Sequence, residues 1–276
     1  GSLTGLRHDL PVASAQVKSA ILLAGLQAEG RTEVCEPLRS RDHTERMLAA
    51  LGVPIDVDGT VVRVGAGAPD PFEIDVPGDP SSAAFFAVAA AITPGSDVVC
   101  EGIACNPTRI GFVDVLRRMG ADIDLEATGD VCGEPVGDLR VRSAALRGTT
   151  IEGAEIPGVI DEIPALAVAA AFADGVTDIR DAAELRVKES DRVATVAGML
   201  GRIGIACEER SDGLVIRGGN PVAADHDSGG DHRIAMAAAV AANAVAGTSR
   251  ISGWAAVASS YPEFADHLGA LTEDRS

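Results

Sequence analysis

Long runs of small apolar residues alternate along this chain with short segments rich in β-branched residues. Each apolar run passes through a glycine turn into such a segment, and this happens four times, at Gly30, Gly95, Gly175 and Gly247. A second amphipathic stretch that ends in Leu-Gly, or in a near variant, follows each turn. The pattern predicts repeated units in the order helix–strand–helix–strand–strand.

The closing strand pair of a unit is clearest at 123–126 with 139–142 and at 206–208 with 214–217. The first helix of each unit is apolar nearly all round, and such a helix belongs inside a domain. The sequence therefore predicts an α/β fold whose first helices pack centrally, beneath the sheets.

A domain boundary is predicted in the segment 76–80, which reads Val-Pro-Gly-Asp-Pro. Asp79 is a suitable N-cap and Pro80 a suitable first helical residue, while a Pro-Gly pair is a natural crossing point between domains. Residues 1–78 then form an incomplete last repeat unit of an N-terminal-side domain. Residues 79–276 form a C-terminal-side domain of three units, the last without its final strands. Because the pattern starts and stops within a unit, we expect the chain to be part of a longer protein.

Composition narrows the function. The apolar stretches at 166–173 and 235–246 are too short or too interrupted to span a bilayer, so we expect a soluble, cytoplasmic protein and no membrane partner. The formal charge of −18 argues against general affinity for nucleic acid. Five scattered cysteines without a C-x-x-C pair argue against a disulfide framework and a zinc site, and we expect no metal and no cofactor.

Three segments could carry chemistry. The first, 12–18, opens a helix with Ser14 and Gln16, where unpaired backbone N–H groups suit a phosphate or carboxylate. The alternative is that Ser14 serves only as an N-cap.

The second segment is 186–192. On a helix, Lys188, Glu189 and Arg192 would share one side, so that two cations hold an anion while the carboxylate moves a proton. The alternative is a salt-bridged helix surface.

The third segment, 230–236, begins a buried apolar helix with Asp231 as a possible cap and Arg233 in the first turn. A buried arginine needs a partner, and a ligand anion would supply it. Asp161, before the apolar helix of the third unit, is either an N-cap or a base. Arg39 and Arg41 are either surface charges or phosphate ligands. We expect the cations at 41, 188, 192 and 233, which come from three repeats, to converge on one anion site.

Together these segments resemble the 5-enolpyruvylshikimate-3-phosphate (EPSP) synthase family along the whole chain, in that family's order. The matching segments are 13–19 (ASAQVKS), 41–45 (RDHTE), 78–82 (GDPSS), 106–109 (NPTR), 160–162 (IDE), 186–192 (RVKESDR), 231–236 (DHRIAM) and 261–264 (YPEF). The Ser-Ala-Gln variant is similar to the bacterial subgroup called class II. The resemblance implies two similar domains of βαβαββ units around buried parallel helices, with this chain as the C-terminal two-thirds.

The resemblance also implies residue roles. Shikimate 3-phosphate would be held by Ser14, Ala15, Gln16, Arg41, Asp161 and Lys188, and phosphoenolpyruvate by Gln16, Arg192 and Arg233. Asp161 would take the proton of the 5-hydroxyl. Glu189 would protonate the methylene carbon and later deprotonate it. The partners would be these two small molecules alone, and the full-length enzyme would be a monomer.

Two departures from the family matter. The family's N-terminal segment, which also binds both substrates, is absent, so we expect this chain to be inactive alone. Ser259 stands where many members carry a lysine that contacts phosphoenolpyruvate. Two rivals remain open: a non-catalytic domain that keeps the fold, and UDP-N-acetylglucosamine enolpyruvyl transferase, whose loop cysteine has no counterpart among the five cysteines here.

Overall fold

The computed structural model describes residues 2–273 and divides the chain into two compact units. Unit 1 comprises the chain up to Pro77 together with residues 104–109 and 127–137, and unit 2 comprises the rest, beginning at Gly78. The chain first changes unit inside the Val-Pro-Gly-Asp-Pro segment. The units are nevertheless not continuous stretches of sequence, because two later segments belong to unit 1. The repeat content of each domain stays a prediction.

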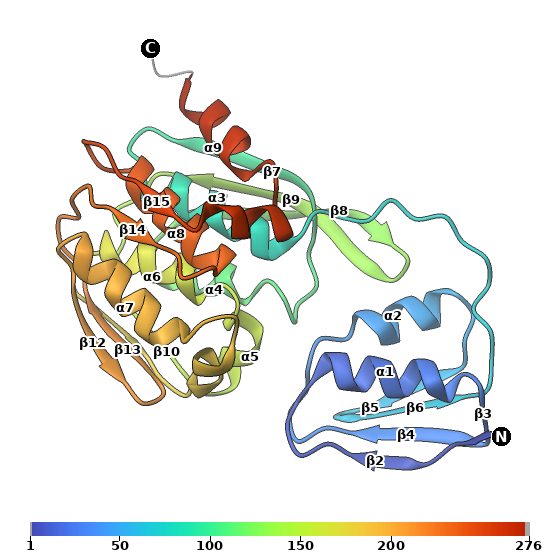
Figure 1. Cartoon of the computed structure of the whole chain (residues 1–276). Helices are drawn as coiled ribbons and strands as arrows, with labels where there is room; N and C mark the ends of the chain where they lie inside the picture. The colour runs from blue at the N-terminus through green and yellow to red at the C-terminus, as the bar shows by residue number, and fades with distance from the viewer. Residues whose placement is uncertain (1, 274–276) are drawn as a thin grey trace. The chain divides into compact units, whose positions relative to one another are not determined.

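Unit 1 contains a four-stranded sheet in the order β2-β4-β6-β5, with α1 and α2 on one of its faces (Figure 1). Its elements are β1 (Leu3–Thr4), β2 (Arg7–Asp9), α1 (Ala15–Gly25), β3 (Ala28–Glu29), β4 (Arg31–Cys35), α2 (His43–Ala50), β5 (Ile55–Asp58) and β6 (Val61–Gly65). Strand β2 runs parallel to β4, with His8 opposite Val34, whereas β6 is antiparallel to both β4 and β5.

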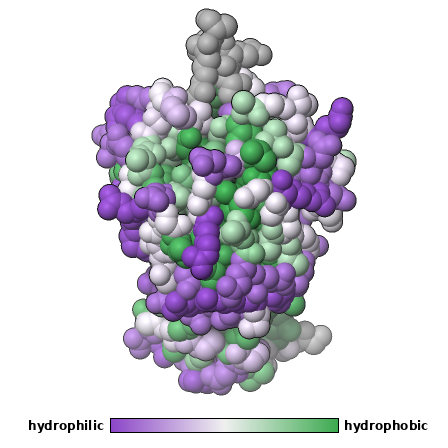
Figure 2. Space-filling view, turned by 90° about the vertical axis from the view of Figure 1, so that its left-hand side faces the viewer, coloured by the Kyte–Doolittle hydropathy of each residue, from purple (hydrophilic) through white to green (hydrophobic). Residues whose placement is uncertain are grey.

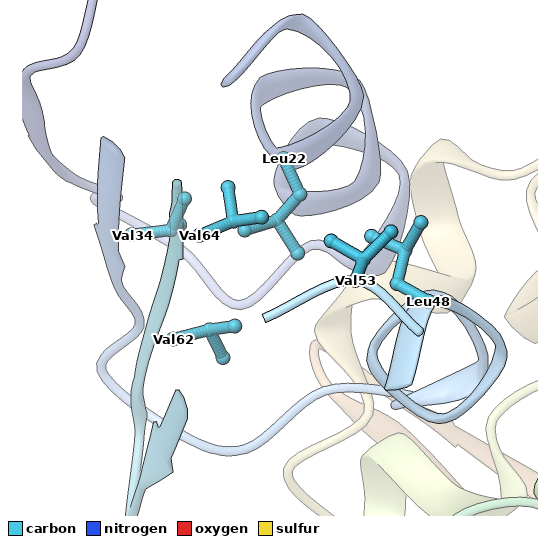
Figure 3. Packing of buried hydrophobic residues seen from close by; sticks show 6 residues of the cluster. All are labelled: Leu22, Val34, Leu48, Val53, Val62 and Val64. Carbon is cyan, nitrogen blue, oxygen red and sulfur yellow. The ribbon is translucent and has the colours of Figure 1, made fainter. Parts of the chain in front are cut away.

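The core of unit 1 forms where the helices meet the sheet (Figure 3). Its buried side chains are Leu22, Val34, Leu48, Val53, Val62 and Val64. Alternation along β6 places Val62 and Val64 on the same face, toward α1 and α2. Full burial of each such side chain contributes about 1.5–3 kcal/mol. Through Leu22 and Leu48 this core holds α1 and α2 against the sheet.

The elements from Gly78 onward follow the predicted repeat. They are α3 (Pro80–Ile92), β7 (Asp97–Ala104), α4 (Gly111–Arg118), β8 (Asp122–Val131), β9 (Glu134–Arg142), β10 (Thr150–Ile151), η1 (Gly153–Glu155), α5 (Ile156–Val159), α6 (Ile163–Ala171), β11 (Val176–Ile179), η2 (Ala183–Val187), α7 (Arg192–Arg202), β12 (Ala206–Arg210), β13 (Gly213–Arg217), β14 (His226–Asp227), α8 (His232–Asn243), β15 (Ile251–Ser252), η3 (Trp254–Ser259) and α9 (Phe264–Glu273). As predicted, Asp79 caps α3 by accepting from the backbone N–H groups of Ser81 and Ser82.

Three apolar helices, α3, α6 and α8, form the centre of unit 2 and contact one another (Figure 1). Every residue of α6 is buried, and so is every residue of α3 except Ser82. Alanine dominates all three sequences, and its small side chain lets neighbouring helices approach closely. The predicted central packing of the first helices is confirmed.

The sheets repeat as well. In unit 2 the order β10-β11-β13-β12 has the same directions as the sheet of unit 1: β10 is parallel to β11, and β13 is antiparallel to β11 and β12. Strands β14 and β15 are again a parallel pair around a helix, α8. The other two sheets have the orders β7-β9-β8 and β1-β3. In three of the repeats a short strand therefore precedes a helix and pairs with the strand that follows that helix. These are β2 and β4 around α1, β10 and β11 around α6, and β14 and β15 around α8.

Figure 2 shows hydrophobic residues gathered in the middle of the face that it views, with hydrophilic residues around them. Within residues 2–273, no helix combines the length and the apolar character that crossing a membrane requires.

Candidate functional site

One arginine organises the polar cluster of unit 2. Arg192 is completely buried, and its guanidinium contacts three carboxylates: Nε lies 2.9 Å from Oδ2 of Asp231, one terminal nitrogen 3.4 Å from Oδ1 of Asp161, and the other 2.5 Å from Oε2 of Glu189. Burial of a charge without partners would be strongly unfavourable, which explains the carboxylates around it. Two residues assigned to proton transfer thus meet at one guanidinium.

The segment 186–192 is not the helix that the spacing suggested. Helix α7 begins only at Arg192, because Asp191 caps it through the backbone N–H of Ala194. Lys188 lies in extended backbone after the short η2 helix. The prediction of a shared helical side is therefore wrong in its geometry. The turn nevertheless brings Glu189 and Lys188 to the same cluster, since Lys188 Nζ lies 3.6 Å from Asp161 and 2.7 Å from Glu184.

Asp161 is not the N-cap of the helix that follows. The cap position of α6 belongs to Glu162, whose side chain accepts no capping hydrogen bond. The Asp161 carboxylate instead lies between Lys188 and Arg192 and keeps 14% of its side-chain surface exposed. Of the two sequence alternatives, the cap is excluded.

The first turns of the three central helices meet at the same cluster. Arg233, in the first turn of α8, donates to the backbone carbonyl of Asp161 over 2.9 Å and lies 3.9 Å from the carboxylate of Glu162. Glu162 is buried and accepts a hydrogen bond from the hydroxyl of Ser81 in α3. The N-terminal ends of α3, α6 and α8 therefore lie together, and their partial positive charges add to the cations there.

The surroundings of the buried Asp231 carboxyl favour its ionised form. Burial alone would raise the pKa of its carboxyl, but the hydrogen bond and charge of Arg192, the Ser190 hydroxyl and the backbone N–H of Arg233 together hold that pKa below its ordinary value. The pKa of His232 is lowered, first by burial and then by the charge of Arg233. Asp231 therefore stays ionised beside Arg192.

In unit 1 the predicted anion-binding segment begins a helix as expected. Ser14 is the N-cap of α1, and its hydroxyl accepts from the backbone N–H of Val17 over 3.3 Å. Ala15 opens the helix, and Gln16 in its first turn is exposed. The cap role of Ser14 is thus real, and it leaves the exposed amide of Gln16 available to solvent on the same turn.

Arg41 follows a loop that is pinned by a buried carboxylate. Asp42 accepts from Arg39 over 2.7 Å, from Arg46 over 2.9 Å and from the amide of Asn106 over 2.7 Å. Burial would raise the pKa of Asp42, but these three groups hold it below its ordinary value. Arg39 is therefore part of the support of the loop. Arg41, the neighbour of Asp42, is partly exposed.

The sequence reasoning missed the residues that support the cations. The sequence predicts the cap role of Asp231 but not its second contact, with Arg192. Glu162, beside Arg233, belongs to the matching segment 160–162, but the sequence assigns it no role. A usable signal is present for both: each acidic residue directly precedes an alanine-rich helix, where a carboxylate becomes buried and needs charged partners. The sequence predicts that a ligand anion pairs with Arg233. In the structure, the backbone carbonyl of Asp161 and the carboxylate of Glu162 supply part of that pairing.

A pocket in unit 2, separate from the cluster around Arg192, is lined by none of the predicted site residues. It has a volume of about 630 Å³ and lies among α3, β7 and α9, with Phe86, Val99, Cys100, Tyr261 and Leu271 in its wall. Burial raises the pKa of the Cys100 thiol to about 11, which keeps it protonated. In the described part of the chain, no group of three or more His, Cys, Asp or Glu residues could hold a metal ion.

Known proteins resemble this chain along its whole length. The sequence profile of the family EPSP synthase (3-phosphoshikimate 1-carboxyvinyltransferase) matches residues 1–268. The 3-phosphoshikimate 1-carboxyvinyltransferase of Synechococcus sp. (strain JA-3-3Ab) is 55% identical over 280 residues, which cover 100% of this chain and 63% of the relative. That of Gloeobacter violaceus is 56% identical over 265 residues, or 95% of this chain and 61% of the relative.

Among solved structures, EPSP synthase from Acinetobacter baumannii matches with a TM-score of 0.93 and 44% identity, over 98% of this chain and 63% of that one. The predicted enolpyruvyl transferase fold is therefore confirmed. The chain spans less than two thirds of the length of each of these relatives.

Proposed function

Because the chain belongs to the EPSP synthase (3-phosphoshikimate 1-carboxyvinyltransferase) family, we propose that it transfers the enolpyruvyl group of phosphoenolpyruvate to the 5-hydroxyl of shikimate 3-phosphate, with release of phosphate. The observation that carries the proposal is the contact of Arg192 with both Asp161 and Glu189. A base and an acid beside one cation suit an addition reaction between anions.

The proposed roles in unit 2 follow from charge and exposure. Arg192 and Arg233 bind the phosphoenolpyruvate anion. A guanidinium carries N–H donors on its two terminal nitrogens, and those of Arg192 become available to an anion when Asp161 and Glu189 turn away from it. Lys188 binds shikimate 3-phosphate and lies beside Asp161, the proposed base.

The proposed roles in unit 1 concern shikimate 3-phosphate. Ser14, Ala15 and Gln16 offer the first turn of α1, where backbone N–H groups and the helix dipole favour a phosphate, and Gln16 also contacts phosphoenolpyruvate. Arg41 adds a cation next to a loop that Asp42 fixes.

The proposed chemistry has two stages. Asp161 removes the proton of the 5-hydroxyl while the oxygen of that hydroxyl bonds to the enol carbon of phosphoenolpyruvate. Glu189 protonates the methylene carbon. The resulting tetrahedral ketal then loses phosphate as Glu189 takes a proton back from the new methyl group. Arginine pairs neutralise the two anions and hold them at reacting distance.

Further features of the proposal rest on the resemblance. The Ser-Ala-Gln motif at 14–16 supports assignment to the class II-like bacterial subgroup. Since the relatives are longer than the matched length, we propose that turnover also uses residues from the remainder of such a protein. We also propose that the full-length enzyme is a cytoplasmic monomer with no partners besides its substrates.

Two alternatives make different predictions. A non-catalytic domain of this family would bind the substrates without turnover. A UDP-N-acetylglucosamine enolpyruvyl transferase would accept a different hydroxyl substrate. The presence of Asp161 and Glu189 favours catalysis over the non-catalytic alternative. The lack of a counterpart to the loop cysteine among the five cysteines, and 55% identity to a 3-phosphoshikimate 1-carboxyvinyltransferase, favour shikimate 3-phosphate over the other hydroxyl substrate.

The test is shikimate-3-phosphate-dependent release of phosphate from phosphoenolpyruvate. It is run on this chain and on its fusion to the portion of the Synechococcus relative outside the matched length. We expect release by the fusion to fall about 10²- to 10⁴-fold in Asp161→Asn and in Glu189→Gln, the usual contribution of general acid–base groups. A folded fusion that binds both substrates but releases no phosphate would favour the non-catalytic alternative.

A further inference from the structure

The three carboxylates around Arg192 differ in how firmly they hold it. The Glu189 side chain is 51% exposed and that of Asp161 is 14% exposed, whereas Asp231, like Arg192, is completely buried. Water competes for an exposed ion pair and is excluded from a buried one. Glu189 and Asp161 can therefore turn away toward a substrate, and Asp231 is the contact that remains.

The Asp231 carboxylate is fully engaged on two sides. Its Oδ1 accepts from the backbone N–H of Arg233 over 2.9 Å and thereby caps α8. Its Oδ2 accepts from Nε of Arg192 and from the hydroxyl of Ser190, each over 2.9 Å. One side chain thus fixes the start of the helix that carries Arg233 and the orientation of the Arg192 guanidinium.

The geometry determines which donors of Arg192 face a ligand. With Nε directed at Asp231, the two terminal nitrogens point toward Asp161 and Glu189. An anion that displaces those two carboxylates then meets a planar fork that is already oriented, and pre-orientation lowers the entropy cost of binding.

We propose that Asp231 is a positioning residue for the anion site: it acts through Arg192 and, as the cap of α8, through Arg233. The inference rests on the proposed function, because it assigns phosphoenolpyruvate to these arginines. It adds a group that has no contact with substrate and no proton to transfer.

The substitution Asp231→Asn separates the two sides of the carboxylate. The amide oxygen can keep the cap of α8, since Asn and Asp cap helices about equally well. The amide nitrogen replaces Oδ2 and turns an acceptor into a donor that faces Nε of Arg192. Asp191→Asn is the matched control: it makes the same change at the cap of α7, where the charged partner is Arg186.

Two measurements test the proposal in the same variants. In the fusion described above, we expect Asp231→Asn to raise KM for phosphoenolpyruvate about 10- to 100-fold, as loss of one charge-assisted hydrogen bond does. KM for shikimate 3-phosphate should change less than threefold, and Asp191→Asn should leave both constants unchanged. In NMR spectra of the chain itself, the Nε–H signal of Arg192, assigned with Arg192→Lys, should exchange slowly with solvent and lose this protection only in Asp231→Asn.

The outcomes separate the positioning role from the function. Equal changes in both KM values, or an Nε–H signal that Asp231→Asn leaves protected, would overturn the role of Asp231. Absence of turnover in the unsubstituted fusion would contradict the proposed function, and the NMR signal would still decide whether Asp231 orients Arg192. Should Asp231→Asn fail to fold, Ser190→Ala removes a contact to the same Oδ2 and should shift both readouts in the same direction by a smaller factor.

Discussion

Lys18 and Glu36 form a buried ion pair in unit 1, with 2.8 Å between Nζ and Oε2. Glu45 contacts the same ammonium group at 2.7 Å, and Lys18 is 1% exposed. One lysine thus joins α1 to the segment after β4 and to α2. Lys18 falls within a sequence motif that resembles a substrate-binding segment, yet its side chain has a structural role.

Replacement of Lys18 by Met should destabilise unit 1 strongly. Two carboxylates would remain buried without a cation, and breaking a buried pair in this way costs about 3–5 kcal/mol. Urea unfolding followed by circular dichroism would measure the loss. Adding Glu36→Gln and Glu45→Gln to Lys18→Met should restore part of it, because no uncompensated charge then remains. A Lys18→Met variant as stable as the unsubstituted chain would contradict the structural role.

Stability should fall as the pH drops below about 6.5, the ordinary histidine pKa. His226 is buried, and burial and the charge of Arg202 lower its pKa against the opposing effect of Asp225; His232 is lowered as well. The folded state then binds fewer protons than the unfolded state between the folded and unfolded pKa values, so each histidine removes stability there, with a slope of at most about 1.4 kcal/mol per pH unit.

The variant His226→Leu checks the origin of this pH dependence. Its stability difference between pH 7.5 and pH 5.5, from urea unfolding at each pH, should be smaller than that of the unsubstituted chain. An unchanged difference would mean that His226 does not contribute. The lowered carboxyl pKa values of Asp42 and Asp231 act at lower pH, where those groups begin to protonate.

Gly213 should not tolerate a side chain. It opens β13, and a Cβ atom there would lie 1.9 Å from the carbonyl oxygen of Ile179 in the neighbouring β11. Gly213→Ala must therefore separate two paired strands, and we expect a loss of about 3 kcal/mol or more, a size tied to specific steric mechanisms. Gly201→Ala is the matched control. Nothing surrounds that position in α7, and alanine there should stabilise the chain by about 0.5–1 kcal/mol.

Lys188 should contribute to the binding of shikimate 3-phosphate and little to the stability of the fold. Its side chain is 21% exposed, and its ammonium lies between Asp161 and Glu184, whose side chain is 63% exposed. We expect Lys188→Met to raise KM for shikimate 3-phosphate at least tenfold in the fusion, because a charge-assisted contact to phosphate is lost. Its urea midpoint should stay within experimental error of the parent. Glu184→Gln, which removes the other ion-pair partner, should change KM by less than threefold.

The repeat, the central helices and the starts of α1, α3 and α8 could be predicted because each depends on local signals. Apolar runs longer than a strand, glycine turns and N-cap residues determine them. The path of 186–192 could not be predicted in the same way. Its residues favour a helix by spacing, but Asp191 caps α7, so that the helix begins only at Arg192.

The residues of the proposed anion site in unit 2 can be recognised in the sequence by their type, whereas their pairing cannot. Arg192 and Asp231 are 39 residues apart, and their contact depends on α7 and α8 lying side by side. The same holds for Ser81 and Glu162, which are 81 residues apart in sequence. Such pairs follow from the packing of whole helices, which no local pattern contains.

The alanine surfaces of α3, α6 and α8 have a consequence for how this protein can vary. Ser81, Glu162 and Arg233 lie at or beside the N-terminal ends of those helices, so the width of the interior contacts sets the spacing of the polar and charged groups there. A methyl group added in the middle of one helix would displace that helix against its neighbours. The charged group at the helix end would then move too, although the methyl group does not touch it. Selection for catalysis would therefore constrain residues that never approach a substrate, and the hydrophobic interior would diverge more slowly than its simple composition suggests.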